Sequence, residues 1–378
     1  MPGSGSVGAV GTPERDHLRF CVALHRAVAG RGDSCFSPYS IASALGMTSQ
    51  ATRGDASAEL VRLLAGEDAD VAKQADLLRA ASALTERGRH EKPVLEVANT
   101  LWAWQGLPLN QDFLGDLAAW PNGAVRSAPF VSDPGAACRM INADVAETTH
   151  DLIPELLPPG SVSPDTVASL VNALYLKVAW IHPFEERRTG PEDFHAPSGA
   201  RRVPTMHVSE QLGYAARDGW QLVELPGAGG VRAVILLPDG DLAEQESTVD
   251  AELLLRLLSA KKQRQVRLSM PKVKLDRKAA LKPALQGLGV HSMFTPAADF
   301  APLSPDPRLV VDDVVHQSVL RLDEQGLEGA AATAVTIRAL AMVTPVDPVE
   351  VVVNRPFLLL VRHAETGVVY FFARVVEP

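Results

Sequence analysis

The chain has 378 residues, of which 46% are hydrophobic and 21% are charged, so it can bury a large core and is not a disordered protein. Its 36 Lys and Arg residues are outnumbered by 45 Asp and Glu residues, and the resulting net charge of −9 argues against a nucleic-acid or membrane-surface partner. The longest apolar runs, such as Val231–Leu237, are far too short to span a bilayer.

Residues 1–13 are rich in glycine and serine and lack the basic start and apolar stretch of a secretory signal. We therefore expect a disordered tail over 1–13, one folded domain over 14–378, and a cytoplasmic location. The chain has three cysteines, Cys21, Cys35 and Cys138, whose odd number and spacing fit neither a disulfide framework nor a zinc site. We expect them to be reduced and mostly buried.

The first part of the chain is predicted to be helical. Thr12-Pro13 and Ser37-Pro38 place a capping residue before a proline, which is the favoured start of a helix. Apolar spacing and similar start signals predict helices over 12–30, 37–47, 56–64 and 69–84, and two more that begin near Asn110 and at 132–134. The alternating segment 96–104 is predicted to be a strand.

The rest of the chain is predicted to be mostly sheet. Strands are expected over 167–180, 202–208, 221–225, 231–237, 265–270, 309–322, 349–353, 357–362 and 368–375, with helices at 252–260 and 277–288. No polar linker separates domains after Pro13, and no repeat of fixed period occurs. This order of elements predicts an α+β fold with one shared core.

The segment Asp323–Met342 combines strong helix formers with β-branched residues. It is rich in alanine, which favours helix, yet Thr333, Val335 and Ile337 favour strand. Two interpretations stay open from these residues: a segment that changes conformation, or a buried alanine-rich helix.

The sequence contains no motif of a familiar catalytic site. A His-Glu-x-x-His pair, a P-loop lysine motif, a Gly-x-Ser-x-Gly elbow and a Cys-x-x-Cys pair are all missing, and the ten histidines are scattered. We therefore expect no catalytic residue, metal or cofactor. The basic cluster of Arg87, Arg89, His90 and Lys92 is too small and too mixed with glutamate to indicate a polysaccharide site.

Five separated stretches together carry a family resemblance. They are Phe36–Leu45, Val97–Trp102, Ile153–Leu157 leading into Leu170–Lys177 with Trp180, His316–Ala334, and Arg355–Gly367 with Arg374–Pro378. In this order the chain resembles the serpins. The resemblance implies a single domain with a large central β-sheet, two further sheets, eight to nine helices and an exposed reactive loop.

The resemblance also implies a function. In that family a serine protease attacks the loop as a substrate, the cleaved loop inserts into the central sheet, and the protease is trapped as an acyl-enzyme. The implied partner is a serine protease, and a cysteine protease is a further option. We expect a monomer, and the family resemblance makes an extracellular location an alternative to the cytoplasmic one.

The resemblance assigns roles to three groups of residues. The hinge of the loop comprises Glu324, Gly326, Leu327, Glu328, Gly329, Ala330, Ala331 and Ala332. Ser37, Ser40, Asn172 and His316 match a polar cluster where the central strands part, called the shutter cluster below. Trp180, Lys272 and Glu324 match the top of the opening sheet, called the breach cluster, where we predict a Lys272–Glu324 salt bridge. A helix cap, a satisfied core polar group or a packed core tryptophan would also account for members of the last two.

Counting from Glu324 in the family register places the reactive bond at Leu340–Ala341. A leucine there suits a chymotrypsin- or elastase-like protease, because one side chain fills the specificity pocket. A shift of two residues gives the alternative bond Arg338–Ala339 and a trypsin-like protease.

Two hinge residues depart from the family pattern. Leu327 stands where inhibitory members have threonine or serine, and we expect its bulk to slow insertion. Gly329 stands where alanine is usual and would weaken an inserted strand. The alternative function is therefore a non-inhibitory binding or carrier protein that is cleaved as a plain substrate.

Overall fold

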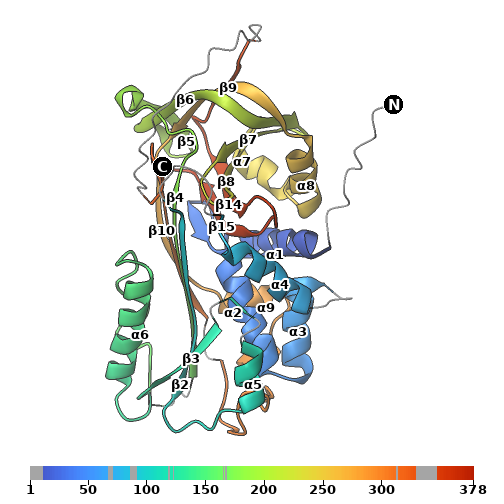
Figure 1. The fold of residues 1–378 in the computed structure, drawn as a ribbon, viewed down its shortest axis with the longest axis vertical. Coiled ribbons are helices and arrows are strands. Elements are labelled where there is room, and N and C mark those ends of the chain that lie inside the picture. The colour runs from blue at the N-terminus through green and yellow to red at the C-terminus, as the bar shows by residue number, and fades with distance from the viewer. Residues whose placement is uncertain are drawn as a thin grey trace.

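A six-stranded sheet runs along the molecule, with α6 on one face and several of the other helices on the opposite face (Figure 1). The structure is a computed structural model of the chain. It describes residues 12–66, 71–85, 92–117, 120–121, 123–164, 166, 168–311, 314–328 and 347–378.

Several helices begin at a residue whose side chain caps the first turn. Ser37 Oγ accepts a hydrogen bond from the Ser40 N–H at 3.2 Å, and Asp133 Oδ1 accepts one from the Ala136 N–H at 2.8 Å, as the Ser-Pro and Asp-Pro pairs predict. The α-helices in the described ranges are α1 (Thr12–Val28), α2 (Pro38–Ala51), α3 (Gly54–Ala65), α4 (Val71–Ser82), α5 (Gln111–Asp116), α6 (Pro134–Thr148), α7 (Leu242–Gln245), α8 (Ala251–Ala260) and α9 (Lys282–Gly287). Short 3-10 turns are η2 (Glu186–Arg188), η3 (Glu246–Thr248) and η4 (Ser292–Phe294).

The six-stranded sheet has the order β10-β11-β12-β4-β2-β3. Its strands are β10 (Val273–Ala280), β11 (Val315–Leu322), β12 (Gly326–Leu327), β4 (Ala168–Ala179), β2 (Val94–Trp104) and β3 (Gly123–Ala128). All neighbours are antiparallel except β2 and β3, which are parallel.

A second, nine-stranded sheet comprises β1 (Ser34–Phe36), β15 (Val369–Val375), β14 (Phe357–His363), β8 (Val231–Pro238), β7 (Trp220–Pro226), β6 (Gly199–Arg217), β9 (Lys262–Pro271), β13 (Val349–Val352) and β5 (Gly190–Ala196). Residues 213–217 of β6 pair with β7, whereas 199–205 pair with β5 and 205–214 pair with β9. The two further sheets expected from the sequence are therefore joined through this long strand.

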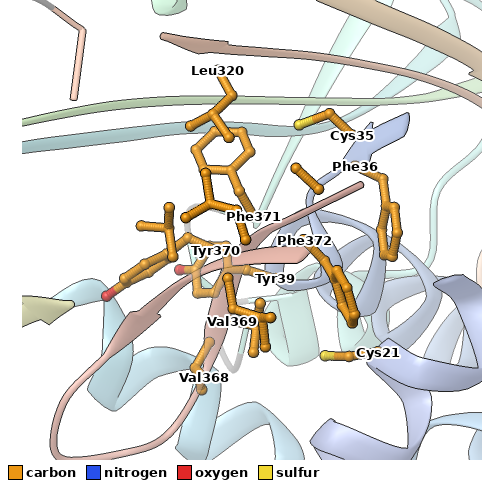
Figure 2. Packing of buried hydrophobic residues seen from close by; sticks show 14 of the residues in the cluster. Cys21, Cys35, Phe36, Tyr39, Leu320, Val368, Val369, Tyr370, Phe371 and Phe372 are labelled. Atoms are coloured by element: carbon orange, nitrogen blue, oxygen red, sulfur yellow. The ribbon is translucent and has the colours of Figure 1, made fainter. Parts of the chain in front are cut away.

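The core lies where α2 packs between β15 and β4, and Figure 2 shows part of it. Phe36 and Phe372 stack with ring centroids 5.7 Å apart, and the rings of Tyr39 and Tyr370 lie 5.6 Å apart at a tilt. Cys21, Cys35 and Cys138 are free and buried, which confirms the prediction from their number and spacing.

Two predicted elements are wrong in part. The helix expected over 277–288 is limited to Lys282–Gly287, because residues 277–280 continue β10 and pair with β11. Their helix propensity is overridden by this long-range ladder. The strand expected over 309–322 begins only at Val315, since the Val311 N–H donates to the Met293 carbonyl instead of to a neighbouring strand.

Candidate functional site

The central sheet has an opening between β4 and β11 that β12 fills only at one end. Gly326 lies opposite Ala179 of β4, and Leu327 lies between Val178 of β4 and Leu322 of β11. Beyond these two residues, no ladder joins β4 to β11 in the described part of the chain. The hinge predicted from the sequence thus begins as a two-residue strand inside the sheet.

Gly326 is required by a close approach between two backbones. A Cβ atom at this position would lie 2.0 Å from the Val178 carbonyl oxygen and 3.0 Å from the Ala179 Cα. Only glycine lets the hinge approach β4 closely enough to pair with it. The family resemblance placed Gly326 in the hinge, and the structure adds a steric reason for glycine at this position.

Leu327 is 1% exposed and packs in the main hydrophobic core. In the uncut protein this side chain already lies between the two long strands. The expectation that its bulk slows insertion of the rest of the loop stays a prediction. The next residue, Glu328, has φ of 59°, a left-handed conformation that is unfavourable for a residue with a Cβ. Its N–H donates to the Arg321 carbonyl at 3.0 Å, and its carboxylate lies 3.3 Å from Arg321 Nη1. The chain therefore leaves the ladder at Glu328.

The breach cluster surrounds the turn that leads into β12. The indole N–H of Trp180 donates to the Asp323 carbonyl at 2.9 Å, and its backbone N–H donates to the Gln325 carbonyl at 2.9 Å. Glu324 is 5% exposed and forms the predicted salt bridge with Lys272, with Nζ to Oε2 at 2.7 Å. Trp180, Lys272 and Glu324 are thus brought together around the start of the hinge.

Thr189 is a partner of Glu324 that sequence reasoning missed. Its hydroxyl donates to Glu324 Oε1 at 2.7 Å. Burial alone would raise the pKa of Glu324, but the hydrogen bonds from Lys272 and Thr189 outweigh it and hold the pKa below its ordinary value. No sequence pattern links Thr189 to Glu324, because they meet only in the folded chain.

The shutter cluster contains one hydrogen-bonded pair on each side of the opening. On the β11 side, the Ser37 N–H donates to His316 Nε2 at 3.0 Å, and Ser37 also caps α2 through the Ser40 N–H. On the β4 side, Asn172 Nδ2 donates to Asn99 Oδ1, with Asn99 directly opposite it on β2. Asn99 was not assigned a role from the sequence, where the available signal was an amide within a strand-like segment, and the structure shows it fully buried.

His316 and Asn172 each retain a buried polar atom without a partner. Burial lowers the pKa of His316 to about 4, so its ring is neutral near pH 7. Because Nε2 accepts the Ser37 N–H, the ring proton resides on Nδ1, and Nδ1 makes no hydrogen bond. Asn172 Oδ1 is also buried and unpaired. Ser40 Oγ of the same cluster is likewise buried without a hydrogen-bond partner. The cluster thus offers an unused donor at His316, an unused acceptor at Asn172 and an unused hydroxyl at Ser40.

The remaining predicted site residues lie outside the described residues. They are Gly329, Ala330, Ala331 and Ala332 of the hinge and both alternative reactive bonds, Leu340–Ala341 and Arg338–Ala339. Within the described ranges, no group of three metal-ligating side chains occurs, and no helix is long and apolar enough to cross a bilayer.

Comparisons with known proteins agree with this geometry. The family model described as Serpin (serine protease inhibitor) matches residues 16–378. The chain is 30% identical to an uncharacterized serpin-like protein of Thermococcus kodakarensis, with 95% of this chain and 84% of the relative aligned. It is 30% identical to a serine proteinase inhibitor of Cavia porcellus, with 96% and 89% aligned. The native structure of a thermophilic serpin, tengpin, superimposes with a TM-score of 0.84 at 25% identity, over 97% of this chain and 94% of that one.

Proposed function

Because the chain belongs to the serpin family, we propose that it is a suicide-substrate inhibitor of a serine protease, cleaved at Leu340–Ala341. The serine Oγ of the protease attacks the carbonyl carbon of Leu340, and the amide bond to Ala341 breaks. The departing amine of Ala341 takes the proton from the histidine of the protease, and Leu340 remains bound as an ester. Insertion of the loop between β4 and β11 then holds the protease at this ester before water can hydrolyse it.

The observation that carries this proposal is the register of β12. Gly326 pairs with Ala179 and Leu327 with Leu322, so each further residue of the loop moves one residue back along both β4 and β11. Extension of the same antiparallel ladder takes residue 337 to Ala168, the first residue of β4, and residue 334 to Val315, the first residue of β11. The opening between the two strands is therefore long enough to receive the loop as far as residue 334, six residues before Leu340.

The alternation of side chains along this register fits the two faces of the sheet. Leu327 points into the main core, so residues 329, 331, 333, 335 and 337 would follow it there. These are Gly, Ala, Thr, Val and Ile, and none is charged. The two charged residues of the segment, Glu328 and Arg338, both fall on the other face. An inserted strand would thus bury no charge in the core.

Thr333 supplies a specific polar fit. It is seven residues after Gly326 and six after Leu327, so the register brings it opposite Asn172, seven before Ala179, and His316, six before Leu322. Its hydroxyl would accept from His316 Nδ1–H and donate to Asn172 Oδ1, two of the buried atoms that have no hydrogen-bond partner in the described part of the uncut protein. Leaving such atoms unpaired costs about 1–3 kcal/mol each, and insertion would remove that cost.

The proposed target is a protease with an apolar specificity pocket, because Leu340 precedes the reactive bond in this register. Cleavage after Arg338 by a trypsin-like protease is the other outcome. Incubation with chymotrypsin, elastase and trypsin separates them, because the mass of the released peptide identifies the bond. A covalent adduct that survives SDS supports inhibition, whereas complete cleavage without adduct by all three proteases supports the carrier function.

A pair of matched variants tests insertion itself. Ala331→Glu would place a carboxylate on the core-facing side of the inserted strand, and we expect it to be cleaved without forming an adduct. Glu328→Asp keeps a carboxylate on the other face, beside the exposed Arg321, and should retain most of the adduct. Equal behaviour of the two variants would contradict the register on which the mechanism depends.

A further inference from the structure

Three side chains on neighbouring strands of the nine-stranded sheet form a hydrogen-bonded row, in the upper part of Figure 1 where β5, β6 and β9 lie. His207 of β6 lies directly opposite Ser269 of β9, and its Nδ1 is 2.9 Å from Ser269 Oγ. On the other side of the ring, His207 Nε2 is 3.0 Å from Oε1 of Glu192 on β5. A hydroxyl, an imidazole and a carboxylate are thus joined in this order.

The carboxylate decides which ring nitrogen can act as a base. Ionised Glu192 only accepts hydrogen bonds, so the neutral ring of His207 donates its Nε2–H to Glu192 and keeps the lone pair on Nδ1. Nδ1 therefore accepts from the Ser269 hydroxyl. In this arrangement a base activates a serine nucleophile and a third group orients the base. Such a set is recognised by geometry and not by sequence position, which explains why no motif predicted it.

The serine lies where a small reagent can reach it. The side chain of His207 is 19% exposed and that of Glu192 is 47% exposed, and Ser269 is itself partly exposed. On the strand at its other side, Ser269 lies opposite Val352 of β13, an exposed apolar side chain. An acyl group that approaches the Ser269 hydroxyl therefore has an apolar neighbour.

We propose that Ser269 is a nucleophile that takes the acyl group of an activated ester, with His207 as its base. Ser269 Oγ attacks the carbonyl carbon of the ester, and its proton passes to His207 Nδ1. The bond between that carbon and the leaving oxygen breaks, the leaving group departs as an anion with the electron pair, and Nδ1 releases the proton to solvent.

The composition of the set defines the class of ester. Glu192, His207 and Ser269 include no separate donor for the carbonyl oxygen that becomes negative during the attack. An ester whose leaving group is a stable anion needs the least assistance, so aryl esters are the expected substrates. The site lies on a different sheet from the hinge of the loop and requires neither cleavage nor insertion.

The test treats the full chain with p-nitrophenyl acetate at mildly alkaline pH. Absorbance follows the release of p-nitrophenolate, and peptide mass spectrometry locates the acetyl group. We expect one acetyl group on Ser269 of the wild type, and Ser269→Ala should lose it. Ser209→Ala is the matched control, since Ser209 Oγ accepts from Gln265 on the same pair of strands, and it should keep the wild-type rate.

The role of the base has its own readouts. His207→Gln should slow the acetylation of Ser269 by about 100-fold or more, because general-base catalysis contributes roughly 10²–10⁴-fold. Glu192→Gln should slow it less, because the ring keeps its place opposite Ser269. In the wild type, the rate should fall in acid, where protonation of the ring removes the lone pair on Nδ1.

Acetylation confined to lysines, with none on Ser269, would overturn the inference. Acetylation of Ser269 at an equal rate in His207→Gln and the wild type, or at a rate that does not fall in acid, would also overturn it. The mapping and the pH profile need only the wild type, so they decide the matter even if a variant fails to fold. None of these outcomes bears on the proposed inhibition, because the reactive loop takes no part.

Discussion

His316 on β11 accepts a hydrogen bond from the backbone N–H of Ser37 at 3.0 Å, across 279 positions of sequence. This bond attaches one side of the opening to the first turn of α2, while Asn172 attaches the other side to β2 through Asn99. When the loop inserts, β4 and β11 must move apart. The Ser37–His316 bond lies on the β11 side of this gap and the Asn172–Asn99 bond on the β4 side.

The protonation of His316 should make stability depend on pH. Its pKa is about 4 in the folded protein and 6.5 in an unfolded chain, so the unfolded chain binds more protons between these values. The stability contributed by neutral His316 is complete above pH 6.5 and is lost as the pH falls toward 4, by about 3 kcal/mol in total. His17, with a pKa also near 4 because of burial, adds a loss of the same sign.

Denaturant unfolding of His316→Gln between pH 7 and pH 4 measures this contribution. The variant should be less stable than the wild type at pH 7, and its stability should fall less steeply below pH 6.5. His195→Gln, at an exposed position, serves as the control and should keep the steep wild-type profile. If the stability of His316→Gln fell with pH as steeply as that of the wild type, His316 would not be the source of the pH dependence.

Replacement of Gly326 should expel the hinge from the sheet. Gly326→Ala places a Cβ against the Val178 carbonyl oxygen, and we expect a loss of stability of about 1–3 kcal/mol. Backbone amides that depend on the ladder, such as that of Trp180, should exchange faster with deuterium. Gly190→Ala is the matched control, since a Cβ there meets nothing within 4 Å, and it should leave exchange at Trp180 unchanged.

Removal of Lys272 should lower the free energy of unfolding, because Glu324 would stay buried without its cationic partner. Lys272→Ala leaves the carboxylate with Thr189 as its remaining side-chain partner, and we expect a destabilisation of about 1–2 kcal/mol at pH 7. Lys272 is 41% exposed, so solvent screening keeps the effect near the lower end of this range.

The same variant has a characteristic acid response. In the wild type, the lowered pKa of Glu324 contributes stability that is present above the unfolded pKa and lost as the pH falls through the folded pKa. Without Lys272 that pKa rises, so stability should begin to fall at a higher pH. Lys274, an exposed lysine two residues after Lys272, provides the control, and Lys274→Ala should lose stability in acid at the same pH as the wild type. If Lys272→Ala also lost stability at the same pH as the wild type, the prediction would be wrong.

Glycine at position 328 should stabilise the uncut protein and weaken inhibition. Glu328 holds φ of 59°, which costs about 1–2 kcal/mol for a residue with a Cβ, and full insertion requires it to become extended. Glu328→Gly removes that strain, so part of the free energy gained on insertion is lost. In a quantitative gel assay, we expect Glu328→Gly to give a higher ratio of cleaved protein to covalent adduct than the wild type. Glu328→Ala keeps the Cβ and separates this effect from loss of the Arg321 contact.

Much of the fold follows from local sequence. Ser37 and Asp133 cap their helices as predicted, because a side-chain oxygen before a proline at the first turn meets a free backbone N–H whatever the rest of the chain does. Residues 277–280 show the opposite case. Their lysine and alanine favour helix, yet pairing with β11 decides their conformation, and that partner lies some forty residues away.

The family, the α+β class, the small side chains at positions 329–332 and the Lys272–Glu324 pair were all predicted from the amino-acid sequence. The contact of Gly326 with a carbonyl oxygen, the burial of Leu327 and the parts of Thr189 and Asn99 in the two polar clusters could be seen only in the folded chain. This difference arises because the chemistry of each side chain follows from the identity of its residue. Close approach, burial and unpaired polar atoms arise only when strands distant in sequence lie side by side.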